Sequence, residues 1–319
     1  MFLGVDGGGT KTTLCLLNSG GRLVAQADAP SCYYFTQGIG LVERVLQQGV
    51  DEVCRQVAIT PADITQAFIG LPSYGEVSGD VNALDAAPLK VLGHGRYSCD
   101  NDMVCGWAGS LGATDGINII SGTGSMAYGV RRERGVRVGG WGELFGDEGS
   151  AYWIATRGLA AFSQMCDGRL PIGPLHGMLR EVLELEADLD LIDVVLNRWR
   201  GERRKVAALC RTVFEAAAAN DICAERILID AATELACIVD AARHRLEFAP
   251  ADTVPVSYSG GVFTSSSMVG FFQRALETLH GDYDLSEPLY SPVVGAALYA
   301  AKLAGTPIDP AFLHRLGLP

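Results

Sequence analysis

Short apolar runs separated by glycine-rich turns dominate the first part of the chain. Residues 2–5 are apolar and lead into the glycines at positions 7–9. Residues 12–17 and 22–27 resume the apolar and β-branched pattern on either side of a tight-turn segment, Asn-Ser-Gly-Gly, at 18–21. Runs of this kind bounded by turn residues are typical of strands. We therefore predict a strand, a glycine turn and two further strands.

The same order of elements returns about 115 residues later. Residues 117–130 contain an apolar run, the turn Gly-Thr-Gly-Ser at 122–125 and a second run, and a third extended segment begins at residue 136. Similar hairpins at corresponding points of two halves suggest an internal duplication. Two unrelated hairpins would leave the same local pattern, because Gly-Thr turns are common.

Apolar residues at helical spacing predict that helices alternate with short strands over most of the remaining chain. The stretch 66–71 is a candidate buried strand. Residues 254–267 contain a strand that runs into glycines and a serine-rich turn, and 282–288 is extended. Residues 77–92 are either helix or loop. We expect helices within or over residues 38–57, 103–111, 148–186, 189–200, 203–220, 224–246, 267–280 and 292–304.

The length of 319 residues suits two domains of roughly 150 residues each. We place the boundary near Asp115 and Gly116, giving domains of residues 1–115 and 116–319, with the last helix packing back on the first domain. The net charge of −12 disfavours a nucleic-acid partner, because an acidic chain repels a phosphate backbone. No apolar run reaches the roughly 18 residues that a membrane span needs, and from the residues at the start of the sequence we expect no secretory signal. We expect a cytoplasmic protein.

Nine cysteines and five histidines are scattered along the chain. They form no C-x-x-C pair and no cluster at the spacing of a zinc motif. We expect reduced, mostly structural thiols and neither a structural metal nor an iron–sulfur cluster.

The glycine turn at 7–9 does not belong to the two commonest phosphate-binding loops. A P-loop or a dinucleotide-binding fingerprint needs a helix directly after the glycines, whereas a strand follows here. Thr10 also occupies the position at which a P-loop has its lysine. The remaining interpretation is a strand-turn-strand motif that offers backbone amides to a phosphate.

Two aspartates near the predicted glycine hairpins are candidates for chemistry. Asp6 ends the first strand beside the glycines, where a carboxylate suits a Mg²⁺-nucleotide, because Mg²⁺ favours one or two carboxylates plus phosphate oxygens. It could equally satisfy turn amides. Asp102 precedes a small-residue helix and is either a general base for a hydroxyl nucleophile or a helix cap.

Residues 139–155, GGWGELFGDEGSAYWIA, form the most unusual stretch of the chain. Its glycines allow tight turns close to a ligand, and Trp141 offers an apolar face of the kind that stacks on sugar rings. Asp147 and Glu148 are expected at the start of a helix. Asp147 could accept hydrogen bonds from sugar hydroxyls there, or it could cap the helix. The Ser-Gly-Gly-Val segment at 259–262 suits an adenine or ribose, or a plain strand-to-helix turn.

Taken together, these segments resemble the superfamily of actin, heat-shock ATPases and sugar kinases. DGGGTKT resembles its first phosphate loop, SGTGS its second and YSGGVFTSS its adenosine segment. Within the superfamily the chain is most similar to the N-acetylglucosamine kinase family, related to ATPases that activate benzoyl-CoA reductase. The run GGWG…GDEGSAYWIA is the most specific part of the likeness. The resemblance implies an α/β fold of two duplicated actin-like (ribonuclease H-like) domains with an ATP cleft between them.

The resemblance also assigns roles to individual residues. Asp102 matches the catalytic aspartate, and Asp6 is expected to position Mg²⁺, through water. With their flanking turn residues, the nucleotide-binding positions are Gly8, Gly9, Thr10, Lys11, Thr12, Gly122, Thr123, Gly124, Gly260, Gly261 and Ser265. The sugar-binding positions are Ser125, Gly140, Trp141, Gly142 and Asp147.

The resemblance implies an ATP- and Mg²⁺-dependent kinase that phosphorylates N-acetylglucosamine at the 6-hydroxyl. Two departures bear on the sugar: Cys32 and Tyr33 follow Ser31 where the family has a polar sugar contact, and Met126 replaces another polar residue. Glucosamine or another hexose derivative is therefore the alternative substrate. An ATPase that activates a reductase would need cluster cysteines, for which no pattern is visible. As partners we expect a small-molecule sugar and a second copy of the chain in a homodimer, with no nucleic acid and no membrane.

Overall fold

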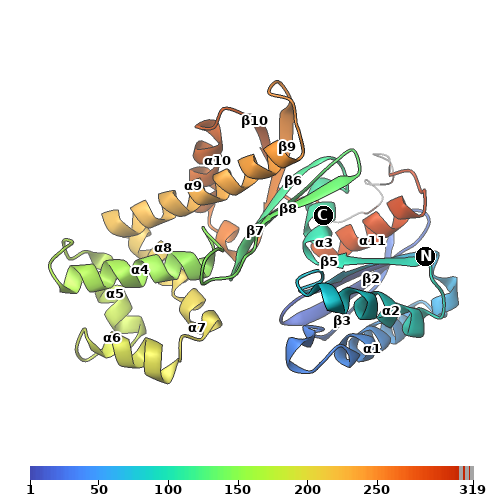
Figure 1. Cartoon of the computed structure of the whole chain (residues 1–319), viewed down its shortest axis with the longest axis horizontal. Helices are drawn as coiled ribbons and strands as arrows, with labels where there is room; N and C mark the ends of the chain where they lie inside the picture. Colours follow the sequence, from blue (N-terminus) through green and yellow to red (C-terminus); the bar gives the residue numbers. More distant parts are fainter. Residues whose placement is uncertain (309–311, 313–315, 317–319) are drawn as a thin grey trace. The chain divides into compact units, whose positions relative to one another are not determined.

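The structure of the protein is a computed structural model that describes residues 1–308, 312 and 316. The chain divides into two compact units, coloured by sequence in Figure 1. Unit 1 comprises residues 1–115 and 287–319, and unit 2 comprises residues 116–286. The chain thus leaves unit 1 once and returns to it.

Unit 1 is built on a five-stranded sheet of order β3-β2-β1-β4-β5. The first three strands form an antiparallel meander, and β4 and β5 run parallel to β1. The strands are β1 (Phe2–Gly7), β2 (Lys11–Leu17), β3 (Leu23–Pro30), β4 (Gln66–Leu71) and β5 (Tyr97–Asn101). The predicted order of strand, glycine turn, strand, tight turn and strand is confirmed.

Helices cover both faces of this sheet. The helices α1 (Gly40–Gln56) and α2 (Val81–Leu92) share one apolar core with it, to which Leu3 and Val5 of β1 belong. The helices α3 (Met103–Leu111) and α11 (Pro292–Leu303) pack against each other and against the strands. A Cβ on Gly4 would lie 2.6 Å from the carbonyl oxygen of Val293 in α11. Because side chains alternate along a strand, Asp6 points to the same face as Gly4.

Unit 2 repeats this sheet with the order β10-β9-β6-β7-β8. Its strands are β6 (Gly116–Ser121), β7 (Ser125–Arg131), β8 (Arg134–Gly139), β9 (Thr253–Ser259) and β10 (Asp282–Ser286). Again the first three are antiparallel, while β9 and β10 follow the direction of β6. The matching order and direction confirm the predicted duplication and the two actin-like α/β domains.

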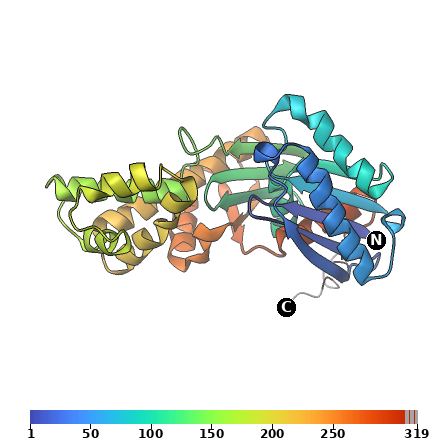
Figure 2. The same ribbon diagram turned by 90° about the horizontal axis from the view of Figure 1, so that it is seen from below.

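The helices of unit 2 extend well beyond the sheet. The long helix α9 (Ile222–Arg245) lies against β6, β7, β8 and α10 (Ser266–Glu277). A second group packs on α9 and on itself, and Figure 2 shows it at one end of this unit. It consists of α4 (Ala151–Cys166), α5 (Pro174–Val182), α6 (Asp190–Ile192), α7 (Arg203–Ala208) and α8 (Cys210–Ala218).

Two predicted helices are less regular than expected. The stretch 189–200 is the short α6 followed by a π-helix over Asp193–Arg198. The stretch 203–220 is broken at Leu209, whose N–H donates to the carbonyl oxygen of Val206, only three residues back. Such a tightened turn interrupts the i→i−4 ladder of an α-helix.

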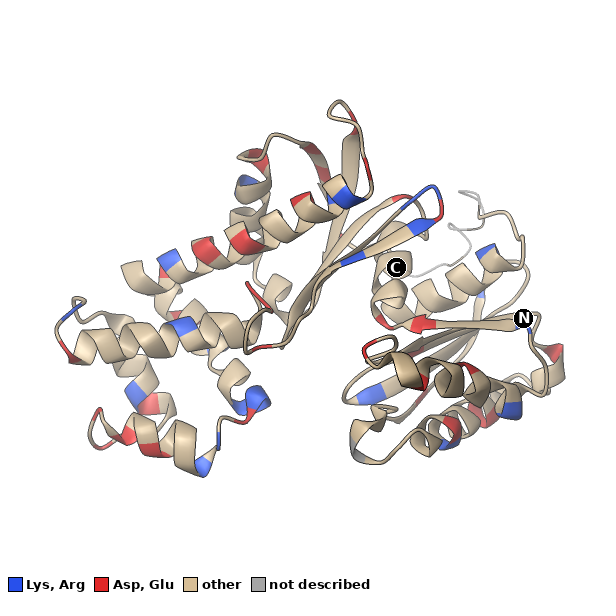
Figure 3. Ribbon diagram, in the orientation of Figure 1, with Lys and Arg blue, Asp and Glu red and all other residues tan. Residues whose placement is uncertain are grey.

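Charged residues of both signs are distributed over the molecule. Figure 3 shows Lys and Arg interspersed with Asp and Glu along the helices of both units. Within residues 1–308, 312 and 316, no helix combines the length and the apolar composition needed to cross a membrane. All nine cysteines are free thiols, as the sequence leads us to expect.

Candidate functional site

The carboxyl ends of the parallel strands in unit 1 bring together two aspartates that are far apart in sequence. Asp6 lies near the end of β1, and Asp102 follows β5 directly. The strand between them is β4, which contributes Gly70 opposite Asp6 and Leu71, whose carbonyl oxygen accepts the Asp102 N–H at 3.3 Å. Ligands of open α/β sheets commonly bind outside this edge of the sheet.

Gly70 permits the close approach of Asp102. A Cβ at position 70 would lie 3.1 Å from the Cα of Asp102 and would overlap Cys105 of α3. Any larger residue at position 70 would therefore push the start of α3 away from the sheet. This position was missed by the sequence analysis, although a glycine inside a predicted strand often marks a close backbone approach.

Asp102 occupies the N-cap position of α3, but its side chain does not cap the helix. The Oδ1 of Asn101 accepts the N–H of Met103 instead, at 3.2 Å. Helix capping therefore does not account for the carboxylate of Asp102.

The Asp6 carboxyl has a strongly perturbed pKa. Burial is the largest cause and the nearby Asp102 carboxylate the second, and together they raise the pKa of Asp6 to about 7, against a smaller opposing effect of Lys11. Two neighbouring carboxylates in a partly buried place repel each other, and a cation beside them relieves that repulsion.

We expect Asp6→Asn to stabilise the ligand-free protein relative to wild type, by an amount that grows with pH. The folded state keeps the Asp6 proton up to about pH 7, whereas the unfolded chain releases it near 3.8. Wild-type stability is therefore lost as the pH rises through this window, by at most about 4 kcal/mol. Urea unfolding of both proteins across the window measures the difference.

Asp28→Asn is the matched control for this prediction. Hydrogen bonds from Thr13 and Lys11 lower the pKa of Asp28, so its ionised form stabilises the fold. The Asp28→Asn variant should therefore become less stable relative to wild type as the pH rises. An Asp6→Asn difference that is independent of pH would contradict the assigned pKa.

The first glycine turn connects β1 and β2 in a tight hairpin. The Gly8 N–H donates to the Lys11 carbonyl oxygen at 2.8 Å, and Gly9 and Thr10 lie exposed at its tip. Lys11 forms an ion pair with Asp28 on β3, at 2.9 Å. Thr12 is fully buried, and its Oγ1 has no hydrogen-bond partner among the described residues. Gly9 and Thr10 are thus the most accessible of the predicted nucleotide contacts in this turn.

The segment that departs from the family pattern lies directly beside this turn. Ser31 Oγ donates to the carbonyl oxygen of Gly8 at 2.8 Å. Cys32 is buried, and its Sγ would lie 2.6 Å from a Cβ at Gly7. Tyr33 is 39% exposed. Of the two residues at the departure, only Tyr33 is therefore exposed enough to touch a ligand.

The second glycine turn connects β6 and β7 in unit 2 and is tied to the loop before α4. Ser121 Oγ donates to the carbonyl oxygen of Gly149 at 2.9 Å, and Ser125 Oγ donates to that of Glu148 at 2.6 Å. The Ala151 N–H donates to the carbonyl oxygen of Gly122 at 2.8 Å. The exposed Thr123 lies at the tip of the turn. These three hydrogen bonds hold the turn and the loop together.

The helix after this loop begins later than predicted. It starts at Ala151, because Ser150 is its cap and its Oγ accepts the N–H of Trp153 at 3.2 Å. The expectation that Asp147 and Glu148 stand at the start of the helix is therefore wrong. Both belong to the preceding loop, and Asp147 has a left-handed backbone with φ of 56°.

Asp147 is almost completely buried and forms an ion pair with Arg203 at the start of α7. Arg203 also reaches Glu143, with Nε 3.1 Å from Oε2. Burial raises the pKa of Asp147, and the Arg203 charge and the backbone amides of Ser125 and Gly142 oppose that rise. The sequence gives no signal for Arg203, which lies more than fifty residues further along the chain.

The loop between β8 and α4 exposes large apolar side chains. Trp141 is 74% exposed, and Leu144 and Phe145 are similarly exposed. Gly140 and Gly142 on either side of Trp141 have positive φ angles of 72° and 94°. Trp141 is therefore a surface residue, and packing in the core does not explain its presence.

The predicted purine segment lies beside the second glycine turn. Gly260 follows β9 with φ of 97°, and a Cβ there would lie 2.5 Å from the carbonyl carbon of Ser121. Only glycine fits this approach. Gly261 is exposed with open space around it, and Ser265 precedes α10 with its Oγ 2.8 Å from that of Ser267. Unit 2 thus brings the turn, the purine segment and the Asp147 loop together.

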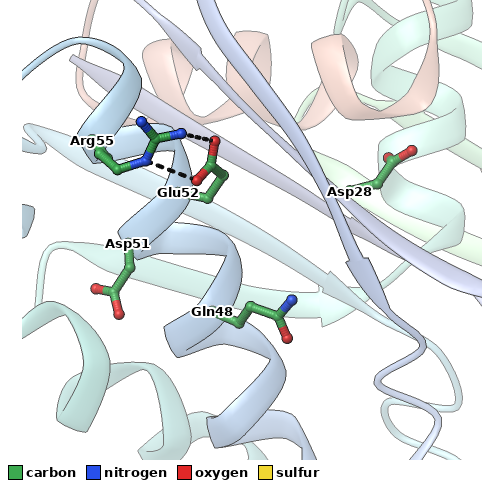
Figure 4. A pocket seen from close by; sticks show the side chains of 5 residues that line it. All are labelled: Asp28, Gln48, Asp51, Glu52 and Arg55. Carbon is green, nitrogen blue, oxygen red and sulfur yellow. Dashed lines mark hydrogen bonds and ion pairs between the residues drawn. The ribbon is translucent and has the colours of Figure 1, made fainter.

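A hollow of about 480 Å³ lies elsewhere in unit 1, and Figure 4 shows the side chains around it. They come from β3 and α1: Asp28, Gln48, Asp51, Glu52 and Arg55. Arg55 is bound to Glu52 by two hydrogen bonds. The hollow is connected to the glycine turn through the ion pair of Asp28 with Lys11.

The duplicated sheet, with a glycine turn after the first strand of each copy, is the fold that solved structures of actin-like sugar kinases also have. The particular family follows from the sequence. Residues 3–300 match the BadF/BadG/BcrA/BcrD ATPase family, and the chain belongs to it. Use of ATP is the property that the family implies.

Proteins named as amino-sugar kinases are similar over most of the chain. An N-acetyl-D-glucosamine kinase of Dictyostelium discoideum is 30% identical over 94% of this chain and 97% of its own length. An N-acetylmuramic acid/N-acetylglucosamine kinase of Clostridium acetobutylicum is 30% identical over 73% of this chain and 76% of its own. A crystal structure of a candidate N-acetylglucosamine kinase from Chromobacterium violaceum covers 93% of this chain and 97% of its own, with 24% identity and a TM-score of 0.69.

Proposed function

We propose that the protein is an ATP-dependent amino-sugar kinase that transfers the γ-phosphoryl group of ATP to the 6-hydroxyl of N-acetylglucosamine. The observation that carries this proposal is Asp102 beside Asp6, at the carboxyl edge of the unit 1 sheet and next to the first glycine turn. The names of the two relatives that are 30% identical support an amino sugar as the substrate.

The nucleotide contacts are expected from both glycine turns and from the purine segment. Gly9 and Thr10 in unit 1, with Gly122 and Thr123 in unit 2, have the accessibility that phosphate binding needs. Gly261 has open space on the side where a Cβ would be, which suits a flat purine or ribose. Backbone amides and hydroxyls can hold a phosphate without a cationic side chain.

Asp6 fits a role beside Mg²⁺. Burial and the neighbouring Asp102 raise the pKa of its carboxyl to about 7, so a cation bound beside it would favour the ionised form. Mg²⁺ typically binds one or two carboxylates together with phosphate oxygens and water. When bound with ATP, Mg²⁺ supplies neutralisation of phosphate charge.

Asp102 is the proposed general base. Its carboxylate accepts the proton of the sugar hydroxyl and orients that oxygen for in-line attack on the γ-phosphorus. Trp141 provides an exposed apolar face for the sugar ring, and the Arg203 ion pair holds the Asp147 carboxylate in the same loop. Catalysis then consists mainly of positioning and of charge stabilisation.

The preferred sugar is tested by a panel assay that measures ADP release. We expect the highest kcat/KM with N-acetylglucosamine, with glucosamine as the competing substrate, because Tyr33 and Met126 replace polar residues of the family pattern. Identification of the product by NMR distinguishes the 6-phosphate from other positions. Absence of turnover on every hexosamine tested would contradict the proposed function, and a preference for glucosamine would correct its substrate.

Three further expectations accompany this proposal. The protein should work in the cytoplasm, form a homodimer and use no nucleic-acid partner. Size-exclusion chromatography with light scattering measures the oligomeric state directly.

A further inference from the structure

Three side chains with metal-binding atoms meet in unit 2, among the helices that extend beyond the sheet. Cys166 is the last residue of α4, His176 lies in α5, and Asp188 follows α5 in the loop before α6. The ligand atoms of the three residues all lie within 4.8 Å of one another. Neither the proposed kinase chemistry nor the family assignment uses any of them.

The spacing of these atoms suits a tetrahedral metal ion. With Zn–S of about 2.3 Å and Zn–N and Zn–O of about 2.0–2.2 Å, ligand atoms around zinc lie roughly 3.3–3.7 Å apart. The Nε2 of His176 and the Oδ1 of Asp188 are 3.4 Å apart. A small inward movement of the Cys166 side chain, which is at the surface, would complete the set.

The imidazole of His176 is held in place by a neighbouring aromatic ring. Its ring stacks on Phe162 with centroids 5.0 Å apart and an interplanar angle of 11°. Nε2 is buried and has no hydrogen-bond partner among the described residues, although the Asp188 carboxylate is near. A buried polar atom without a partner is costly, and a metal ion would satisfy its lone pair.

Asp188 is also oriented from outside the cluster. The Nη1 of Arg180 donates to Asp188 Oδ1 at 2.7 Å, and its Nη2 donates to the carbonyl oxygen of Glu186 at the same distance. A ligating carboxylate is commonly held in this way by a second hydrogen-bonding group. With a thiolate, a carboxylate and the Arg180 charge, the site carries a formal charge of about −1, which favours a divalent cation.

We propose that Cys166, His176 and Asp188 bind a Zn²⁺ ion through three protein ligands, with a fourth position open to water. Binding releases the proton of the Cys166 thiol to solvent, because the thiolate is the ligand. The ion joins the end of α4, the first turn of α5 and the loop after α5. This site differs from the expectation of no structural metal, which rested on the absence of a motif with close spacing.

The experiment uses the full chain after removal of metal with a chelator. We expect one Co²⁺ to bind per chain, with a thiolate-to-metal charge-transfer absorption, and one equivalent of Zn²⁺ to displace it. Cys166→Ser should abolish the charge-transfer absorption, and His176→Gln should weaken binding at least about tenfold. Cys237→Ser is the matched control, because Cys237 is another exposed cysteine of the same unit, on α9. It should bind Co²⁺ as the wild type does.

A second measurement needs no variant and is independent of kinase activity. Iodoacetamide labelling followed by mass spectrometry compares the alkylation rates of individual cysteines. Zn²⁺ should slow alkylation at Cys166 and leave Cys237 unaffected. Unchanged labelling of Cys166 in the presence of Zn²⁺, or a Co²⁺ spectrum that Cys166→Ser does not alter, would overturn the proposal. Neither result depends on whether the protein phosphorylates a sugar.

Discussion

Changing Asp102 to asparagine is expected to lower kcat for sugar phosphorylation by about 10²–10⁴-fold. The amide has nearly the shape of the carboxylate but cannot accept the proton of the attacking hydroxyl. KM for ATP should change little, because Asp102 is assigned to the sugar hydroxyl rather than to the nucleotide. Steady-state kinetics with the best sugar of the panel, measured by ADP release, checks both values.

Asp100→Asn is the matched control for this experiment. Asp100 lies on β5 only two residues away, is partly buried, and uses its Oδ1 to accept the Asn101 N–H at 2.7 Å. We expect its kcat to stay within a few-fold of wild type. If Asp102→Asn also retains wild-type activity within a few-fold while its melting temperature is unchanged, Asp102 is not the general base.

Changing Gly295 to alanine is expected to cause the largest loss of stability. Gly295 lies in α11, where a Cβ would lie 2.5 Å from both the Cys105 carbonyl oxygen and the Gly109 Cα of α3. These are backbone atoms, so relief requires the two helices to separate. Overpacking of this kind costs about 3 kcal/mol or more. A lower midpoint in urea or thermal unfolding is the measurement.

Gly177→Ala provides the control for the glycine substitution itself. Gly177 lies within α5 and has open space where a Cβ would be. Because glycine is unfavourable inside a helix, this change should stabilise the protein by roughly 0.5–1 kcal/mol. Equal effects of the two substitutions on the free energy of unfolding would show that the close packing of α3 on α11 does not limit stability.

The strands and their order around the glycine turns could be predicted because local chemistry determines them. A period of two, β-branched residues and tight turns are visible in any short window of sequence, and both antiparallel meanders follow from them. Residues 203–220 show the limit of this reasoning. Their apolar spacing is continuous, yet a single shortened hydrogen bond at Leu209 divides the helix.

The candidate site was predictable where a motif contains its residues and not where the fold supplies them. Asp6 is recognisable from its position at the end of a predicted strand and Asp102 from its position before a small-residue helix. Their proximity, however, depends on β4 lying between β1 and β5. The ion pair of Asp147 with Arg203 joins positions 56 residues apart, and no pattern in the sequence links them. The Cys166 cluster combines three different residue types on separate elements, so no spacing rule could reveal it.

The return of the chain to unit 1 has a consequence for how the protein folds as it is synthesised. Unit 2 is complete once Ser286 has left the ribosome, and it can fold as a continuous segment. Unit 1 lacks α11 until the whole of unit 2 has been synthesised, although most of that helix is buried against α3 and β1. The first 115 residues must therefore wait for α11, with one apolar face of their sheet uncovered, while unit 2 can already be folded.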